Sequence, residues 1–464
     1  MKKLMSLFLI FSLAFTLAPT SVLAEGDDLG TTTLACDANV AACIGEVGYT
    51  TLQEAIDVNQ TAEINLMKEI TESVIIESDK NITLNLNGNK ITNSDGQHTI
   101  TNRGTLIING EGTVDNVSHG KGALLNDGGN ATIKGGEFTR SKENGQSSTD
   151  NGGNSWYVIS NENNGTMSFE GGNVHATGKY SSLVRNYGTM DIKGGIFSNS
   201  FIAIKSEEGT TLNITNGEIY SDTQSLQTYG TATISGGSLK GQVTVVNWQD
   251  FKSTTTITGG SITGDVVVWD DSSATQKIDA IINGGTVNGS LVVWDNDGKP
   301  IEENDRLNID VQSGTFSDNV EKFVVDDAAF LNVDGTYFAG SEENLKEKAK
   351  SATTSVNVIK GVKELDDISP DVTVTNSTND KITVNKETLE SGKVVVVKPS
   401  ISTTPNVKDE ASKTSGYDDG GPFTTDACGN VFDRWGNEVY HAPVCVSNNS
   451  AGDNTYTLVN TSDH

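Results

Sequence analysis

Proline, cysteine, aromatic side chains and basic residues are all scarce in this sequence. Of 464 residues only 7 are Pro and 4 are Cys, aromatic residues make up 6%, and 32 basic side chains stand against 61 acidic ones. The formal net charge of −29 argues against nucleic acid and anionic membranes as partners, because both bind through positively charged surfaces. Glycine is abundant instead, with 49 residues. We therefore expect a folded, strand-rich protein whose architecture depends on where the glycines stand.

Long hydrophobic runs are missing after the first 24 residues. Met1 and two lysines precede an apolar run from Leu4 to Leu17, and Val22 and Ala24 stand at the positions expected before a cleavage site. This order is typical of a secretory signal peptide cleaved after Ala24. No later segment has the roughly 20 apolar residues that span a bilayer. We expect the mature protein to be secreted or associated with the cell surface, without membrane insertion.

The four cysteines fall into two local pairs, Cys36 with Cys43 and Cys428 with Cys445. Disulfides persist outside the cytoplasm, and four cysteines allow three connectivities. Closure of the shorter loops favours two local bridges, each of which fastens a small terminal segment. The alternative is a structural metal site, but the CxxC-type spacing of such sites is absent.

Pairs of glycines mark a repeat in the middle of the chain. Residues 131–138, 190–197 and 232–239 share the order apolar, Thr or Asp, Ile, any residue, Gly, Gly. The last glycines of the complete and degenerate copies are Gly88, Gly112, Gly136, Gly172, Gly195, Gly217, Gly237, Gly260, Gly285 and Gly314. Most steps between them lie between 20 and 25 residues, which is the length of one unit in a repeat protein.

A second element, an aliphatic-x-Asn triplet that leads to Gly-Thr, precedes most copies, as in Ile100–Thr105 and Val184–Thr189. Each repeat therefore holds three short runs with period-two alternation, separated by Gly-rich corners, and this pattern indicates strands. Three short strands per repeat, parallel to those of the neighbouring repeats, predict an all-β fold, a parallel β-helix of about ten coils.

The asparagine of each triplet is expected to point inward and to form hydrogen bonds with the peptide groups of its own corner and of the next coil. A ladder of such side chains is predicted. Its members are Asn102, Asn126, Asn161 and Asn186, with Ser206, Thr228, Asp270 and Asp295 at the matching positions of later coils.

The two ends of the repeat differ from its middle. Thr51 and Glu54 form a capping-box pattern, so a short helix is expected to cover the first coil. After Phe316 the repeat fades, and Ser341–Ala352 is typical of a charged helix. The expected divisions are a signal peptide at 1–24, a Cys-bracketed segment at 25–48, the β-helix at 49–338, a helix with a small β-rich region at 339–398, a linker at 399–422 and a Cys-bracketed C-terminal unit at 423–464.

Three segments, Ile44–Ile56, Asn81–Gly88 and Gly314–Val320, resemble exported right-handed parallel β-helix proteins of Gram-positive, host-associated bacteria. The resemblance covers residues 44–338 and belongs to the broad pectate-lyase-like superfamily. It implies a right-handed β-helix that is secreted or displayed on the cell surface, often as an adhesin-like protein. The superfamily also includes polysaccharide lyases and glycoside hydrolases, so the fold by itself does not assign an activity.

Catalytic motifs of the β-helix glycosidases are not present in order. Their pattern runs Asn-Thr-Asp, Asp-Asp, Gly-His-Gly and Arg-x-Lys, whereas the chain has only Ser118–Gly120, Arg140–Lys142 and Asp270–Asp271, in a different order. A lyase needs a base and cations to hold an acidic sugar, and so negative a protein repels uronate polymers. The sequence thus favours a protein without catalytic residues.

Two late coils place a Trp at the aliphatic-x-Asn position, in Val266–Asp271 and in Leu291–Asp297. Trp269 and Trp294 should project outward from stacked coils about 5 Å apart, and Trp248 could extend the row. With Asp270, Asp271 and Asp295 beside them, the rings could form a glycan-binding platform. The alternative is that the row packs against the later domain or against the loops at 272–277 and 296–305, because exposed aromatic rows are uncommon.

The preferred hypothesis is a secreted or cell-surface, adhesin-like protein that binds a glycan or another component of a host or bacterial surface without catalysis. A polysaccharide lyase or glycoside hydrolase is the first alternative, and a structural stalk is the second. No cofactor or metal site is predicted. Calcium is conceivable with so many acidic residues, but Asp295–Gly298 lacks the first ligand and the distal Glu of an EF-hand loop.

Overall fold

The computed structural model describes residues 34–93, 96–142, 157–176, 182–198, 200–247, 251–270 and 275–399, and the backbone of five short strands beyond them. The chain divides into two units, one up to Ser400 and one from Ile401. The strands of the second unit are β41 (Thr424–Thr425), β42 (Val431–Phe432), β43 (Glu438–Tyr440), β44 (Cys445–Val446) and β45 (Leu458–Val459). The predicted signal peptide, the linker and the Cys428–Cys445 bridge lie outside the described residues.

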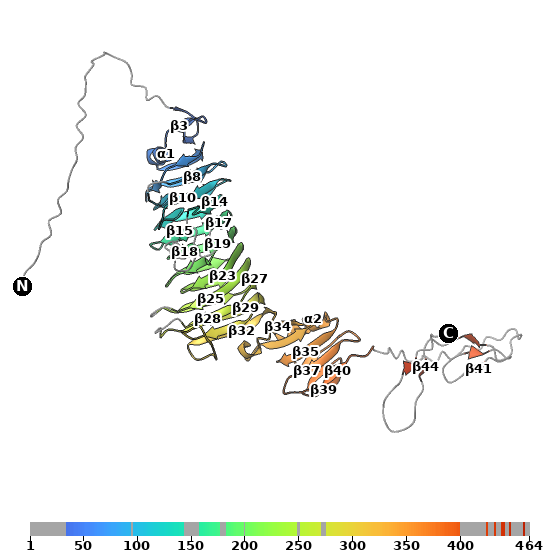
Figure 1. The fold of residues 1–464 in the computed structure, drawn as a ribbon. Helices are drawn as coiled ribbons and strands as arrows, with labels where there is room; N and C mark the ends of the chain where they lie inside the picture. Colours follow the sequence, from blue (N-terminus) through green and yellow to red (C-terminus); the bar gives the residue numbers. More distant parts are fainter. Residues whose placement is uncertain are drawn as a thin grey trace, which may run out of the picture. The chain divides into compact units, whose positions relative to one another are not determined.

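Most of the described part of the first unit is a β-solenoid in which each coil runs through three faces (Figure 1). The strands of face 1 all pair in parallel with those of the coils before and after. They are β4 (Thr61–Leu66), β7 (Asn81–Asn85), β10 (Thr105–Asn109), β13 (Asn130–Ile133), β16 (Thr166–Phe169), β19 (Thr189–Ile192), β22 (Thr211–Ile214), β24 (Thr231–Ile234), β26 (Ser253–Ile257), β29 (Ile278–Asn288) and β32 (Leu307–Phe316).

Face 2 follows the corner that carries one or two glycines in most coils. Its strands are β5 (Ile70–Thr71), β8 (Lys90–Thr92), β11 (Thr113–Asp115), β14 (Glu137–Thr139), β17 (Asn173–His175), β20 (Ile196–Ser198) and β27 (Ser261–Thr263), with the first parts of β23 (Glu218–Thr228) and β25 (Ser238–Val246) and the last parts of β29 and β32.

The third face carries the predicted asparagines, and we call it the ladder face. Its strands are β6 (Val74–Ile76), β9 (Ile100–Asn102), β12 (Leu124–Asp127), β15 (Tyr157–Glu162), β18 (Ser182–Asn186), β21 (Ile202–Ser206), β28 (Val266–Trp269) and β30 (Leu291–Trp294), with the last parts of β23 and β25 between them.

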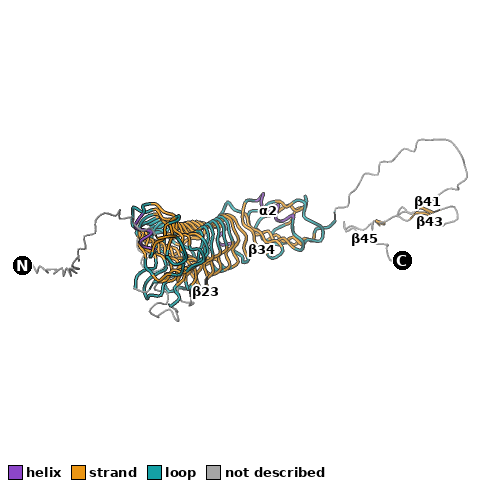
Figure 2. The backbone as a smooth tube through the Cα atoms, turned by 90° about the horizontal axis from the view of Figure 1, so that it is seen from above, coloured by secondary structure: helices purple, strands orange, loops and turns teal. Residues whose placement is uncertain are grey.

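The predicted parallel β-helix with three short strands per coil is therefore confirmed, and Figure 2 shows the strands of successive coils lying side by side with loops at their corners. The solenoid makes about 13 turns rather than about ten. The estimate from the sequence followed the glycine pairs, and coils such as the one formed by β4, β5 and β6 contain no glycine at all.

Alternating Ile, Val, Leu and Phe side chains fill one continuous core inside the coils. Each Gly-Gly corner is tight for two separate reasons. Gly172 has a φ of +82°, which favours glycine, and a Cβ on Gly171 would lie 2.5 Å from the carbonyl oxygen of Lys134 in the preceding coil. The glycine pairs therefore mark where neighbouring coils come closest together.

The asparagine ladder is present and fully buried. The side-chain amides of Asn102 and Asn126 each donate to the Oδ1 of the next asparagine at 2.7 Å, Asn161 donates to Asn186 at 2.8 Å, and Asn186 donates to Ser206 Oγ at 3.1 Å. Backbone carbonyls of the corners accept further bonds from the same amides. The ladder thus links neighbouring coils through their interior.

The predicted continuation of the ladder to Asp270 and Asp295 is wrong. Thr228 follows Ser206 in register, and the next residues in that column are Val245, Val268 and Val293. The error is a register shift of two residues. A shift of two leaves the facing of every side chain unchanged, since side chains alternate with period two, so Trp269 still projects outward.

A small antiparallel cap covers the N-terminal end of the solenoid. It consists of β1 (Leu34–Ala35), β2 (Ala42–Ile44), β3 (Val47–Tyr49) and α1 (Leu52–Val58), and β2 pairs with β4. The predicted capping box of Thr51 and Glu54 is present. The Glu72 carboxylate accepts from the backbone N–H groups of Leu52 and Gln53, both at 2.9 Å, which fixes α1 to the first coil. The predicted Cys36–Cys43 disulfide is formed.

The C-terminal end continues into a β-rich region with its own core. It begins at a 3₁₀ turn, Glu321–Phe323, and β34 pairs antiparallel with β32. Its elements are β33 (Ala329–Val333), β34 (Thr336–Gly340), α2 (Glu342–Lys350), β35 (Ser355–Lys360), β36 (Glu364–Leu365), β37 (Thr373–Asn376), β38 (Ile382–Val384), β39 (Glu387–Leu389) and β40 (Val394–Val396). The helix expected at Ser341–Ala352 corresponds to α2, for which Ser341 is the N-cap.

A candidate binding groove on the ladder face

The two tryptophans of the predicted glycan-binding platform, Trp269 and Trp294, are the last residues of neighbouring strands. Trp269 on β28 lies directly in register with Trp294 on β30, and both side chains are partly exposed. The indole N–H of Trp269 donates to the carbonyl oxygen of Asp295 at 2.9 Å. In the preceding coil the residue in register with Trp269 is Val246. Trp248, which was predicted to extend the row, lies outside the described residues.

The carboxylates beside these tryptophans are engaged within the protein. Both terminal nitrogens of Arg306 donate to the Asp270 carboxylate. Asp295 Oδ1 accepts from the backbone N–H groups of Asp297 at 3.0 Å and Lys299 at 2.8 Å, which closes a turn. Asp271 lies outside the described residues. The loop after β30 therefore packs beside the Trp pair, as the alternative interpretation expected, and it returns through β31 (Pro300–Ile301) to pair with β30.

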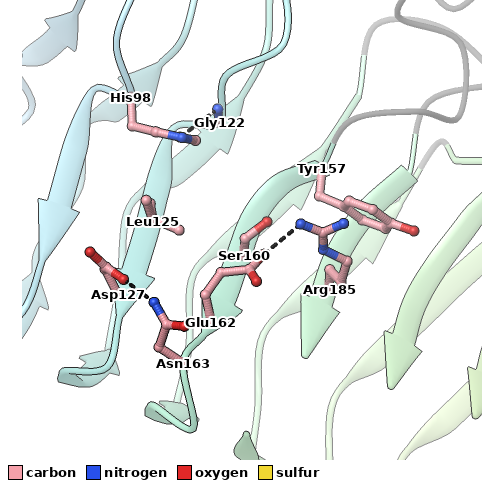
Figure 3. Close-up of a pocket in the computed structure, with 9 residues that line it drawn as sticks. All are labelled: His98, Gly122, Leu125, Asp127, Tyr157, Ser160, Glu162, Asn163 and Arg185. Carbon is pink, nitrogen blue, oxygen red and sulfur yellow. Dashed lines mark hydrogen bonds and ion pairs between the residues drawn. The ribbon is translucent and has the colours of Figure 1, made fainter. Parts of the chain in front are cut away.

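A better-formed hollow lies earlier on the same face, over β12, β15 and β18 (Figure 3). It has a volume of about 270 Å³. Its lining residues are His98, Gly122, Leu125, Asp127, Tyr157, Ser160, Glu162, Asn163 and Arg185. We refer to these nine residues as the groove. Leu125 and Ser160 pair in register on neighbouring strands. Each comes directly before an inward asparagine, Asn126 or Asn161, and because side chains alternate along a strand, both point outward.

Two acidic residues line the groove on neighbouring strands, because Asp127 on β12 is in register with Glu162 on β15. Arg103 Nε lies 3.1 Å from Asp127 Oδ2, and the Asn163 amide donates to Asp127 Oδ1 at 2.5 Å. The hydrogen bond from Arg103, followed by that from Asn163, lowers the pKa of Asp127. Asp127 is therefore ionised at neutral pH and presents hydrogen-bond acceptors.

Arg185 forms the opposite side of the groove. Its guanidinium donates to Glu162 Oε1 at 2.5 Å, and its central carbon lies 5.0 Å from the ring centres of both Tyr157 and Tyr187. Tyr157 is only 9% exposed, and burial raises its phenol pKa. The cation is thus held between two rings and one carboxylate, a fixed geometry that combines an ion pair with cation–π contacts.

His98 forms the end of the groove nearest the start of the solenoid. Its Nδ1 accepts from the backbone N–H of Gly122 at 2.9 Å. Burial, followed by the charge of Lys121, lowers the His98 pKa to about 4. At neutral pH the ring is therefore uncharged, and because Nδ1 is an acceptor its proton is on Nε2. His98 contributes one hydrogen-bond donor and no charge.

Asn116 holds this end of the groove in place from below. Its fully buried amide donates to Gln97 O at 2.9 Å, Thr99 Oγ1 at 3.1 Å and Gly122 O at 3.0 Å. These partners flank His98 in the chain and include its own hydrogen-bond partner. A satisfied buried polar network of this kind is rigid, so the groove is preorganised.

The groove does not reach the Trp pair. After Arg185 the next outward side chains are Lys205 and Glu207, which form a 3.0 Å ion pair, and Glu207 is 4% exposed with a pKa raised by burial. Beyond them Val246 and Val267 are fully buried although they point outward. The groove and the Trp pair are therefore two separate surfaces of one face.

The imperfect catalytic motifs do not assemble into one site. Ser118–Gly120 follows β11 and Arg140–Lys142 follows β14, whereas Asp270 follows β28, many coils further on. Within the described residues, no three His, Cys, Asp or Glu side chains gather as a metal site would need, and no helix there has the length and apolar character to cross a bilayer. Comparisons with family models, curated proteins and solved structures find no match to this chain.

The groove could not be recognised in the sequence. His98, Asp127, Tyr157 and Glu162 come from three coils, and they are neighbours only because Asp127 pairs with Glu162 across 35 residues. Outward polar residues also stand in the next coils, at Lys205, Glu207 and Gln227, so residue type alone did not mark the groove.

Proposed function

We propose that this protein is a secreted or cell-surface β-helix that binds glycans without catalysis, as adhesin-like proteins of host-associated bacteria do. Within that proposal it belongs to the pectate-lyase-like group of right-handed β-helices, and its partner is a glycan of a host or bacterial surface. The observation that carries the proposal is the groove, with its preorganised donors, acceptors and aromatic wall on one solenoid face.

The chemistry of the groove matches a sugar ring. Asp127 and Glu162 offer acceptors for hydroxyl groups, while His98 Nε2, Ser160 and Asn163 can donate to ring and hydroxyl oxygens. Tyr157 and Leu125 add apolar surface against which C–H groups can pack. A volume of about 270 Å³ is below the range typical of drug-sized ligands, so the groove suits one sugar unit of a longer chain.

Binding without hydrolysis is favoured by the state of the carboxylates. A glycosidase of the usual kind needs one carboxyl group as a proton donor and a second as base or nucleophile. Asp127 is a poor donor because Arg103 and Asn163 lower its pKa, and Glu162 is held by Arg185. Glu207, whose pKa is raised, is buried outside the groove.

A glycan array with the full chain tests the proposal. Ser160→Trp fills the groove from an outward, partly exposed position and should abolish binding of any glycan that the wild type retains. Ser168→Trp is the matched control, because Ser168 has the same exposure class on face 1, away from the groove. If both variants still bind the glycan, the groove is not the binding site.

The Trp pair is tested separately on the same array. A double variant, Trp269→Ala with Trp294→Ala, should leave groove-dependent glycans bound, since the fully buried Val246 and Val267 separate the two surfaces. Loss of binding in this variant but not in Ser160→Trp would move the site to the platform. If the wild type binds no glycan, the protein is better regarded as a stalk.

A glycoside hydrolase is the second candidate, because two carboxylates in register on adjacent strands are a possible acid–base pair. Release of reducing ends from a panel of polysaccharides checks it. Activity that is lost in both Asp127→Asn and Glu162→Gln would replace the binding proposal with an enzyme. No release by wild-type protein that binds the same polysaccharide supports binding alone.

A further inference from the structure

We infer that the groove selects uncharged sugar units and rejects sugars that carry a carboxylate, such as uronic acids. This inference rests on the proposed function and narrows its ligand class. It follows from how the cations around the groove are used, and not only from the charge of the whole chain.

Arg185 is the only cationic side chain among the nine groove residues. One terminal nitrogen donates to Glu162, and the guanidinium lies between the rings of Tyr157 and Tyr187. Its Nε is buried from solvent. Because Nε is buried and Nη2 already donates to Glu162, a ligand carboxylate that paired with Arg185 would have to share the guanidinium with Glu162.

Arg103, the next cation along the face, is likewise committed within the protein. Its Nε pairs with Asp127 and its Nη1 donates to both carboxylate oxygens of Glu77, at 3.2 and 3.3 Å. Lys121 is close enough to affect the His98 pKa but does not line the groove. The uncharged His98 ring adds no positive charge at neutral pH.

A ligand carboxylate would also meet the acidic side chains of Asp127 and Glu162, two residues in register on neighbouring strands that line the groove. Like charges repel more strongly where the protein excludes water. The same two groups favour a neutral sugar, because its hydroxyls are donors that ionised carboxylates accept strongly. One arrangement therefore attracts hydroxyls and repels an acidic sugar.

The test uses pairs of ligands that share a sugar ring and differ in whether they carry a carboxylate. Galacturonic acid oligomers are prepared in methyl-esterified and de-esterified forms, and galactose with galacturonic acid and glucose with glucuronic acid are displayed as further pairs on one support. Binding of the full chain is measured at neutral pH and 0.15 M salt. In at least one pair the uncharged member should bind at least tenfold more tightly, and the ratio should shrink at high salt.

Glu162→Gln sharpens the test, because it removes one repelling charge and releases Arg185 while keeping the shape of the side chain. The preference for the uncharged member should fall at least tenfold in this variant. Glu170→Gln is the control, since it removes the same charge from an exposed residue after β16 that pairs with Lys134 on face 1. Circular dichroism checks that both variants fold like the wild type.

The outcomes separate the two proposals. Equal binding of charged and uncharged partners, or tighter binding of the uronates, overturns this inference and leaves glycan binding intact. A preference that Glu162→Gln leaves unchanged also overturns it, since the discrimination would then come from elsewhere. Absence of binding to every probe overturns the proposed function, and the inference with it.

Discussion

The early and late halves of the ladder face have the same backbone and opposite chemistry. In the early half the inward column is Asn102 to Asn186, and most of the side chains that line the groove are polar. In the late half the inward column is Val245, Val268 and Val293, and outward Val246 and Val267 are fully buried. A solenoid can therefore confine a binding surface to a few coils without changing its fold.

The largest effect on stability is expected when an inward Asn of the early half is replaced by Val, or an inward Val of the late half by Asn. Asn161→Val should destabilise the solenoid by about 3 kcal/mol, because Asn126 and Asn186 lose a buried partner. Val268→Asn should cost about as much, because it buries an amide without a partner in an apolar column. Urea unfolding measures both, with outward Thr132→Val as the control. If either substitution leaves the free energy of unfolding unchanged, the polar and apolar inward columns do not differ in what they require of a side chain.

Acid should weaken the early half through His98. Its pKa is about 4 in the folded protein against an ordinary value of 6.5, so the unfolded chain binds more protons between these values and stability falls as the pH drops from 6.5 towards 4. At about 1.36 kcal/mol per pKa unit, the upper limit is about 3 kcal/mol.

His98→Gln should remove this part of the acid sensitivity, measured as the change in unfolding free energy between pH 7 and pH 4. His119→Gln, at an exposed position nearby, is the control. NMR titration of the His98 ring gives the pKa directly. A value near 6.5 would contradict the buried, uncharged ring.

A smaller effect is expected in the late half from Asp270. Asp270→Asn weakens its contact with Arg306, which anchors the loop after β30, and should cost about 1 kcal/mol because the pair is only partly buried. Trp269 and Trp294 should become more exposed, seen as a red shift in tryptophan fluorescence. An unchanged spectrum would show that the loop does not depend on this pair.

The smallest effect is expected at Glu207, where the two halves meet. Burial raises its pKa, so the folded state holds its proton more tightly and stability falls as the pH rises above the ordinary value of 4.5. Glu207→Gln should change the free energy of unfolding by no more than about 1 kcal/mol, because loss of the Lys205 ion pair offsets part of the gain from removing a buried charge. Relative to the wild type, the variant should be more stable at pH 8 than at pH 5. Thermal unfolding at the two pH values checks the direction.

Much of the architecture could be predicted because each element depends on local chemistry. Thr51 and Glu54 specify the capping box, Cys36 and Cys43 are close in the chain, and each Gly-Gly corner recurs with its own coil. The turn count was too low because coils without glycine gave no signal. The register of the Trp coils was displaced by two residues, because a run of consecutive aliphatic residues such as Val266–Val268 fits either register equally well.

The sequence by itself determined the repeat, the inward asparagines and the outward direction of the tryptophans, since period-two alternation and glycine spacing are properties of single coils. Only the tertiary structure decided which outward residues become neighbours. Asp127 meets Glu162, and Arg185 lies between Tyr157 and Tyr187, because insertions of unequal length separate strands that stack in exact register. That the outward Val246 is fully buried was likewise visible only in the tertiary structure.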